Sequence, residues 1–202
     1  MKRMVVLFAL CTIGLSCNQK VERQKKNLSR PLIILQPLEL NDSSALVFLK
    51  DSISHFYPVD VIIAAEKKFP ETLFYKPRNR YRADRIIHWL RMSIADSVRL
   101  IVGITSKDIS STKNNVYDYG VMGLGYQPGH ACVVSSFRFI KTAKSKQQYQ
   151  QRLFKVVVHE MGHNFGLPHC PNQSCIMVDA EGKMKLDEEK GLCTDCKMKL
   201  KI

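Results

Sequence analysis

The feature that most constrains the fold of this chain is the run from His159 to His169, which reads H-E-x-x-H-x-x-G-x-x-H. Residues four apart lie on the same side of a helix, so His159 and His163 can offer their imidazoles to one metal ion. Gly166 can adopt a left-handed conformation that ends the helix, and the turn brings His169 back as a third ligand. Three neutral imidazoles leave the fourth position of a zinc ion to water, which is typical of a catalytic site.

Glu160 follows the first predicted ligand, and its side chain is long enough to reach a water molecule on the metal. Zinc lowers the pKa of such a water to about 7 and polarises a bound carbonyl group. Glu160 is therefore predicted to be the general base, which takes the water proton and passes it to a leaving amine. The motif indicates hydrolysis of an amide bond without a covalent intermediate.

The rest of the chain alternates between short apolar runs and helical periodicity. Apolar runs at 31–36, 60–65 and 98–104 predict strands that are buried on both faces. Apolar residues at helical spacing predict helices at 46–56, 83–94 and 147–164, the last of which carries the histidine motif. Strands that alternate with helices favour a mainly parallel sheet.

A polar stretch at 106–115 precedes two further apolar segments, 117–122 and 131–139, which flank the glycine-rich run 123–129. These segments predict two strands around a turn, as a hairpin or an edge strand. The expected fold class is α/β (α+β). It consists of a mixed, mainly parallel twisted sheet with an antiparallel edge strand, two backing helices, a zinc-binding active-site helix and a small Cys-rich C-terminal part.

The N-terminus has the form of an export signal. Lys2 and Arg3 precede an apolar run that ends near Cys17, and this run of about 12 residues is too short to span a bilayer. The segment resembles a bacterial lipoprotein signal, which implies lipidation of Cys17; ordinary signal cleavage and an uncleaved anchor are the alternatives. We expect a signal peptide at 1–16, a polar tether at 17–30 and one domain at 31–202.

The chain carries a formal net charge of +13, which permits binding to anionic polymers, anionic lipids or acidic partners. A nucleic-acid binder is expected to interleave basic and aromatic residues. The basic run of Lys141, Lys144 and Lys146 has no such aromatic residues. No nucleic-acid partner is therefore expected.

Four cysteines follow the histidine motif: Cys170, Cys175, Cys193 and Cys196. Four thiolates can form a closed tetrahedral zinc site, which leaves no position for water and is therefore structural. Two disulfides are the alternative, because an exported protein meets an oxidising compartment. A C-x-x-C pair forms an internal disulfide only with strain.

The motif and the cysteines together resemble the archaemetzincin family of zinc metallopeptidases, in the metzincin clan, over about residues 31–198. The resemblance implies that His159, His163 and His169 bind the catalytic zinc and that Glu160 is the base. It also implies that Met177 forms the turn beneath the metal, that the four cysteines bind zinc, and that strand 117–122 borders the cleft.

The leading hypothesis is a zinc metallopeptidase with two Zn²⁺ ions per chain, one catalytic and one structural. Its substrates are expected to be peptides or proteins, and its action that of an aminopeptidase or a limited-range endopeptidase. We expect the protein to be exported and held at a membrane of the bacterial cell envelope by its lipid anchor. The alternative is a zinc-stabilised binding module with weak or no proteolytic activity, which the presence of Glu160 disfavours.

Overall fold

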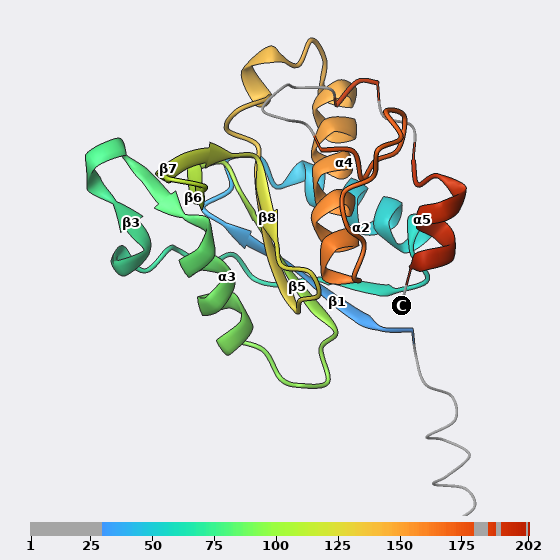
Figure 1. Cartoon of the computed structure of the whole chain (residues 1–202). Coiled ribbons are helices and arrows are strands. Elements are labelled where there is room, and N and C mark those ends of the chain that lie inside the picture. Colours follow the sequence, from blue (N-terminus) through green and yellow to red (C-terminus); the bar gives the residue numbers. More distant parts are fainter. Residues whose placement is uncertain (1–29, 180–185, 189–190, 201) are drawn as a thin grey trace, which may run out of the picture. The chain divides into compact units, whose positions relative to one another are not determined.

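The computed structural model describes residues 30–179, 186–188, 191–200 and 202 (Figure 1). The expected signal peptide, Cys17 and residues 17–29 of the expected tether lie outside the described residues. Residues 31–202 form one unit.

Strands and helices alternate along the first part of this unit, and the C-terminal part is helical or irregular. The strands are β1 (Leu32–Leu38), β2 (Asp60–Ile63), β3 (Phe74–Tyr75), β4 (Arg80–Arg82), β5 (Leu100–Thr105), β6 (Ile109–Lys113), β7 (Val116–Val121), β8 (Gly123–Gly125) and β9 (Ala131–Ser135). The α-helices are α2 (Ser44–Phe56), α3 (Ala83–Met92), α4 (Lys146–Asn164) and α5 (Thr194–Lys199). Short 3₁₀ helices occupy Glu71–Leu73, Lys76–Arg78 and Ile140–Thr142.

The main sheet has the strand order β2-β1-β5-β9-β8. β1 pairs in parallel with β2 and β5, β5 pairs in parallel with β9, and only the β8–β9 pair is antiparallel. The predicted fold class, a mainly parallel sheet with an antiparallel edge strand, is confirmed.

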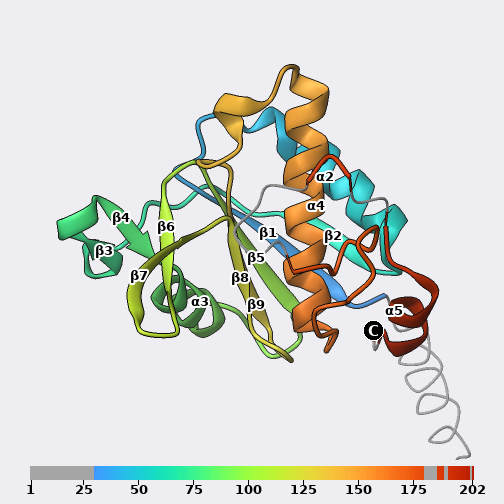
Figure 2. The ribbon, with the colours of Figure 1, turned by 45° about the horizontal axis from the view of Figure 1, so that its top comes forward.

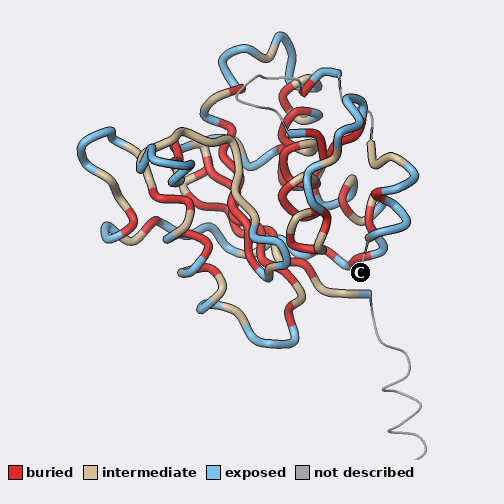
Figure 3. The backbone as a smooth tube through the Cα atoms, viewed as in Figure 1, coloured by how far each residue is buried: buried red, intermediate tan, exposed pale blue. Residues whose placement is uncertain are grey.

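Helices cover both faces of this sheet. α2 and α4 pack on one face, over a core that includes Leu49, Val102 and Val157, whereas α3 packs on the other face against Ile101 and Val133 (Figure 2). The central strands and the inner side of α4 are buried (Figure 3). The three helices predicted from apolar periodicity are all present, with ends that differ by only a few residues.

The outer strand β2 departs from its prediction. Its apolar run was expected to be buried on both faces, yet Ile62 is 47% exposed and Ile63 is 37% exposed. β2 lies at the edge of the sheet and has a neighbouring strand on one side only, so part of the strand faces solvent. β5, which lies in the middle of the sheet, is buried along its whole length.

The glycine-rich segment 123–129 also differs from its prediction, because its first part is strand β8 and not a turn. A Cβ atom at Gly123 would lie 2.5 Å from the Glu160 Oε1 atom, and one at Gly125 would lie 2.6 Å from the Glu160 backbone oxygen. Only glycine permits so close an approach of the strand backbone to the backbone and side chain of Glu160. These two glycines therefore let the edge strand pack directly against α4.

A second sheet, with the order β3-β4-β6-β7, was not predicted, and the polar stretch 106–115 contributes its strand β6. Arg82, which is 1% exposed, holds this sheet together. Its guanidinium pairs with Asp84, donates to the Thr112 hydroxyl at 2.9 Å and to the Tyr117 carbonyl oxygen, and stacks on the Tyr117 ring. β6 and β7 form a hairpin on this support.

Helix α4 is fixed at both ends and along its buried side. The Ser145 side chain caps its N-terminus by accepting a hydrogen bond from the Gln148 N–H at 3.1 Å. Tyr57, which follows α2 and is 1% exposed, donates its hydroxyl to the Val158 carbonyl oxygen at 2.9 Å. This hydrogen bond joins the helix of the histidine motif to the α2–β2 connection.

We predict that Tyr57→Phe lowers the free energy of unfolding by about 1 kcal/mol, because it removes a buried hydrogen bond and retains the ring packing. Chemical denaturation of the two proteins measures the difference. The matched control is Tyr117→Phe. The Tyr117 side chain is half-exposed, so the loss of its hydroxyl should leave the free energy of unfolding unchanged. Equal midpoints for wild type and Tyr57→Phe would contradict the assigned role.

Candidate active site

Three histidines converge at the C-terminal end of α4. His159 and His163 lie one turn apart on the helix, and their Nε2 atoms are 3.1 Å apart. Each of the three histidines, including His169, offers a nitrogen within 4.8 Å of the other two. A tetrahedral zinc ion with Zn–N bonds of about 2.0 Å holds its ligand atoms about 3.3 Å apart. The three imidazoles therefore fit a zinc ion, as their spacing in the sequence predicts.

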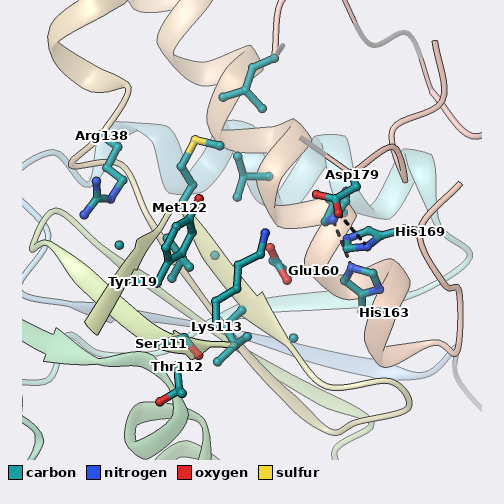
Figure 4. A pocket seen from close by; sticks show the side chains of 18 of the residues that line it. Ser111, Thr112, Lys113, Tyr119, Met122, Arg138, Glu160, His163, His169 and Asp179 are labelled. Atoms are coloured by element: carbon teal, nitrogen blue, oxygen red, sulfur yellow. Dashed lines mark hydrogen bonds and ion pairs between the residues drawn. The ribbon is translucent and has the colours of Figure 1, made fainter. Parts of the chain in front are cut away.

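The return of His169 depends on the turn at Gly166. α4 ends at Asn164, and Gly166 has a φ of +93°, a conformation that L side chains rarely adopt. The Gly166 N–H donates to the His163 carbonyl oxygen at 2.8 Å, and the Leu167 N–H donates to the Gly162 carbonyl oxygen at 2.9 Å. These hydrogen bonds reverse the chain and bring His169 beside the helix (Figure 4).

Backbone carbonyls orient the two helical imidazoles. The Nδ1 atom of His159 lies 2.7 Å from the Ile176 carbonyl oxygen, and that of His163 lies 2.8 Å from the Leu167 carbonyl oxygen. A carbonyl oxygen can only accept, so each Nδ1 carries the proton and each Nε2 presents a lone pair to the metal site. Burial, with a contribution from neighbouring His163, lowers the pKa of His159 to about 4. The ring is therefore neutral at neutral pH, which is the form that binds a metal.

The third histidine has a carboxylate partner that the sequence analysis missed. The Nδ1 atom of His169 lies 3.7 Å from Oδ2 of Asp179 (Figure 4). A carboxylate in this position favours the proton on Nδ1 and turns Nε2 to the metal site. Asp179 comes two residues after Met177, and no spacing rule in the sequence marks it out.

Glu160 is almost fully buried between α4 and β8, on the wall of the cavity that also contains the three histidines. Burial raises the pKa of its carboxyl to about 8, and a hydrogen bond from the Gly125 backbone N–H opposes the shift. A divalent cation on the histidines would also favour the ionised carboxylate, because opposite charges lower the pKa of an acid.

Met177 packs against the turn of α4 that lies between the two helical histidines. It is fully buried, and a Cβ atom at Gly162 would lie 2.5 Å from its sulfur. The structure thus brings Met177 beneath the residues of the histidine motif. This is the position that the resemblance to archaemetzincins implies for Met177.

The four tail cysteines converge at a second place. Their sulfur atoms all lie within 4.8 Å of one another, with 3.7 Å between Cys170 and Cys193 and 3.7 Å between Cys175 and Cys196. No disulfide joins them. A tetrahedral zinc with Zn–S bonds of about 2.3 Å holds its sulfurs about 3.8 Å apart. Both the donor set and its dimensions therefore fit zinc.

A cavity of about 1020 Å³ extends from the histidines along the edge of the fold. Its walls come from α4, β8, the β6–β7 hairpin and residues close to Met177. Segment 117–122 was expected to be the edge strand beside the cleft. Residues 118–122 line the cavity, and 117–121 belong to β7. However, β7 is the edge of the second sheet, and β8 is the edge of the main sheet next to Glu160.

Two further polar residues hold the end of α4, and the sequence analysis missed both. The Asn164 side-chain amide donates to the carbonyl oxygens of Tyr126 and Ala131, at 2.9 Å and 3.2 Å. Arg99 donates to the carbonyl oxygens of Gly129 and Asn164, at 2.9 Å and 3.1 Å. These bonds tie the helix end to the loop after β8. No local sequence signal identifies such long-range partners.

Comparison with known proteins places this chain in a family. The sequence model of peptidase family M54 matches residues 47–202. The archaemetzincin of Haloquadratum walsbyi is 33% identical over 148 residues, which cover 69% of this chain and 82% of that protein. The archaemetzincin of Halobacterium salinarum is 31% identical over 153 residues, which cover 72% of this chain and 85% of that protein.

Solved structures agree with this placement. The crystal structure of the archaemetzincin of Methanopyrus kandleri matches with a TM-score of 0.73 and 26% identity, over 85% of this chain and 94% of that one. The archaemetzincin of Archaeoglobus fulgidus, complexed with malonate, matches with a TM-score of 0.72 and 26% identity, over 84% of this chain and 99% of that one. The chain therefore belongs to peptidase family M54, the archaemetzincins, and is a zinc-dependent metallopeptidase.

Proposed function

We propose that the chain hydrolyses peptide bonds at the three-histidine centre, with Glu160 as the group that accepts and returns the proton. The observation that carries the proposal is the position of Glu160. It follows the first histidine on α4 and lines the same cavity as all three. A carboxylate beside a metal site, in a cavity large enough for a peptide, is the arrangement that metal-assisted hydrolysis needs.

The residues of the centre have separate roles in this proposal. His159, His163 and His169 hold zinc, which supplies a Lewis acid that polarises the carbonyl group and lowers the pKa of water. Glu160 accepts one proton from the attacking water and delivers it to the leaving nitrogen, while the oxygen of the water enters the new carboxyl group. The Gly125 N–H orients the carboxylate.

The same chemistry serves an aminopeptidase and a limited-range endopeptidase. The ends of the products distinguish them, because an aminopeptidase releases single residues from the N-terminus and an endopeptidase cuts within the chain. Digestion of a peptide library by the zinc-loaded protein, with and without chelator, provides this measurement. The competing function, a zinc-stabilised binding module, predicts no cleavage under any of these conditions.

We predict that Glu160→Gln retains zinc but loses at least about 100-fold in kcat/KM, because the amide keeps the shape of the side chain and cannot accept the proton. Metal analysis and peptide cleavage measure the two quantities. Glu71→Gln, in an exposed 3₁₀ helix, is the matched control and should cleave as the wild type does. Undiminished cleavage by the zinc-loaded Glu160→Gln protein would refute the mechanism.

We also propose a second, structural zinc held by Cys170, Cys175, Cys193 and Cys196. The tetrahedral dimensions of the four sulfurs support it. Four thiolates fill the coordination sphere, so this ion stabilises the tail and leaves no position for substrate. Because Cys170 directly follows His169, the second site fixes the third histidine of the catalytic centre.

We predict two zinc ions per chain in the wild type, and one in the double variant Cys193→Ser, Cys196→Ser, which should also unfold at a lower temperature. Elemental analysis and thermal denaturation measure these outcomes. Cys132→Ala removes a buried thiol outside the cluster and should keep both ions. One zinc per wild-type chain, together with no reactive thiol among the four cysteines, would establish disulfides in place of the second ion.

For the N-terminal residues, we propose export, removal of residues 1–16 and lipidation of Cys17, with residues 17–30 as a tether for the domain at 31–202. The support is the sequence pattern: a basic start, a short apolar run and a cysteine before a polar segment. The protein would then act at a membrane of the bacterial cell envelope. In the part of the chain that the structure describes, no helix is long and apolar enough to cross a membrane.

We predict that the wild-type protein partitions into detergent and incorporates labelled fatty acid, and that Cys17→Ser abolishes the labelling. Phase partition and labelling in a bacterial host measure both effects. Cys132→Ser is the control, since its thiol is buried within the domain. Equal labelling of wild type and Cys17→Ser would rule out this anchor.

A further inference from the structure

The cavity that contains the histidines is rich in cationic side chains. Three carboxylates line it: Asp118, Glu160 and Asp179. Its cations are Arg78, Arg80, Lys113, Arg138 and Lys155. The lining is therefore positive even before a zinc ion adds its own charge. A cleft with one sign of charge concentrates ligands of the opposite sign.

Arg138 is held in place at the far end of this cavity from the histidines (Figure 4). Its guanidinium lies against Gly120 of β7, in the space that a Cβ atom would need. Its Nη2 donates to the Asp108 carboxylate at 2.8 Å, and the same carboxylate lies 3.0 Å from Nε of Arg80. Arg80 also pairs with Asp118 at 3.2 Å, and Arg78 shares that carboxylate at 3.4 Å. Three guanidiniums thus share two carboxylates, so their charge is only partly compensated.

Lys113 is the second cation, at the end of β6 in the β6–β7 hairpin. Its ammonium lies 5.2 Å from the centre of the Tyr119 ring. None of the ion pairs among the described residues includes Lys113. Figure 4 shows its side chain extending into the cavity toward Glu160. An ammonium in this position can pair with an acidic side chain of a peptide that occupies the cavity.

The two cations lie within a short length of chain from the reacting group. The Gly123 backbone contacts Glu160, and the Gly120 backbone contacts Arg138. Three residues of extended chain span at most about 11 Å. A peptide with its scissile bond beside Glu160 therefore brings residues up to about three positions away to Arg138. The Lys113 side chain extends toward Glu160 itself, so it lies along the same path (Figure 4).

We propose that the preferred substrates are acidic peptides, with an Asp or Glu side chain within three residues of the scissile bond bound by Lys113 and Arg138. The inference rests on the proposed function, because it concerns the substrate of the same site. The two cations act as specificity-determining residues, and neither takes part in proton transfer.

The test uses pairs of peptides that differ only by Glu or Gln at one position, scanned over three residues on each side of the cleaved bond. At the position with the largest effect, we expect the wild-type kcat/KM to be about tenfold higher for the Glu peptide than for the Gln peptide. Two partly solvated ion pairs together contribute about this much binding free energy. Lys113→Gln and Arg138→Gln should each reduce this preference several-fold. Lys144→Gln, an exposed cation outside the cavity, should leave it unchanged.

A charge reversal gives the sharper result. Lys113→Glu should prefer a Lys peptide to the Glu peptide at the same position, whereas the wild type prefers the Glu peptide. Lys113 is exposed, so these substitutions leave the core intact even if Arg138→Gln destabilises the protein. Two results would overturn the proposal. One is an equal wild-type kcat/KM for the Glu and Gln peptides at every position. The other is a fall in the kcat/KM of the Lys113 variants that is the same for the Glu peptide as for the Gln peptide.

A binding measurement separates this inference from the proposed function. Fluorescently labelled Glu and Gln peptides are titrated with zinc-loaded Glu160→Gln protein, in which turnover is not required. Tighter binding of the Glu peptide, reduced by Lys113→Gln, supports acidic recognition even if the wild type cleaves no peptide; in that case only the proposed hydrolysis fails. Equal binding of the two peptides refutes acidic recognition whatever the cleavage result.

Discussion

The close packing of helix α4 on the edge strand β8 is the constraint on which the candidate active site depends. Side chains at positions 123 and 125 would collide with Glu160, so two glycines bring the strand backbone into contact with the helix. The Gly125 N–H then reaches the Glu160 carboxylate, and the unpaired edge of β8 borders the same cavity as the histidines. The position of Glu160 is thus set by the absence of side chains opposite it.

The parts that the sequence predicted well are those whose determinants are local. Helix periodicity at 147–164, the four-residue spacing of His159 and His163, and the glycine at 166 act within a few residues of one another, and the structure has all three features. The mainly parallel sheet follows from the order of apolar runs. The family resemblance, carried by the histidine motif and the four cysteines, is confirmed.

The parts that were wrong or missed depend on partners far away in the chain. Gly123 and Gly125 look like turn residues until Glu160 lies opposite them. The second sheet has short, polar strands, and the buried Arg82 that supports it bonds to Thr112 and Tyr117 across the fold. Asp179 becomes the partner of His169 only after the chain has turned at Gly166 and again beyond it. Periodicity and spacing carry no information about such contacts.

The segment from Cys170 to Val178 links the histidine cluster to the cysteine cluster through its backbone. The Cys170 N–H donates to the Met177 carbonyl oxygen at 2.8 Å, and the Ile176 carbonyl oxygen lies 2.7 Å from Nδ1 of His159. The same segment carries Cys175 and packs Met177 under the helix. A displacement of this segment would therefore rotate the His159 imidazole without removing it. The orientation of the histidine cluster therefore depends on how well the cysteine cluster is held in place, although the two clusters share no side chain.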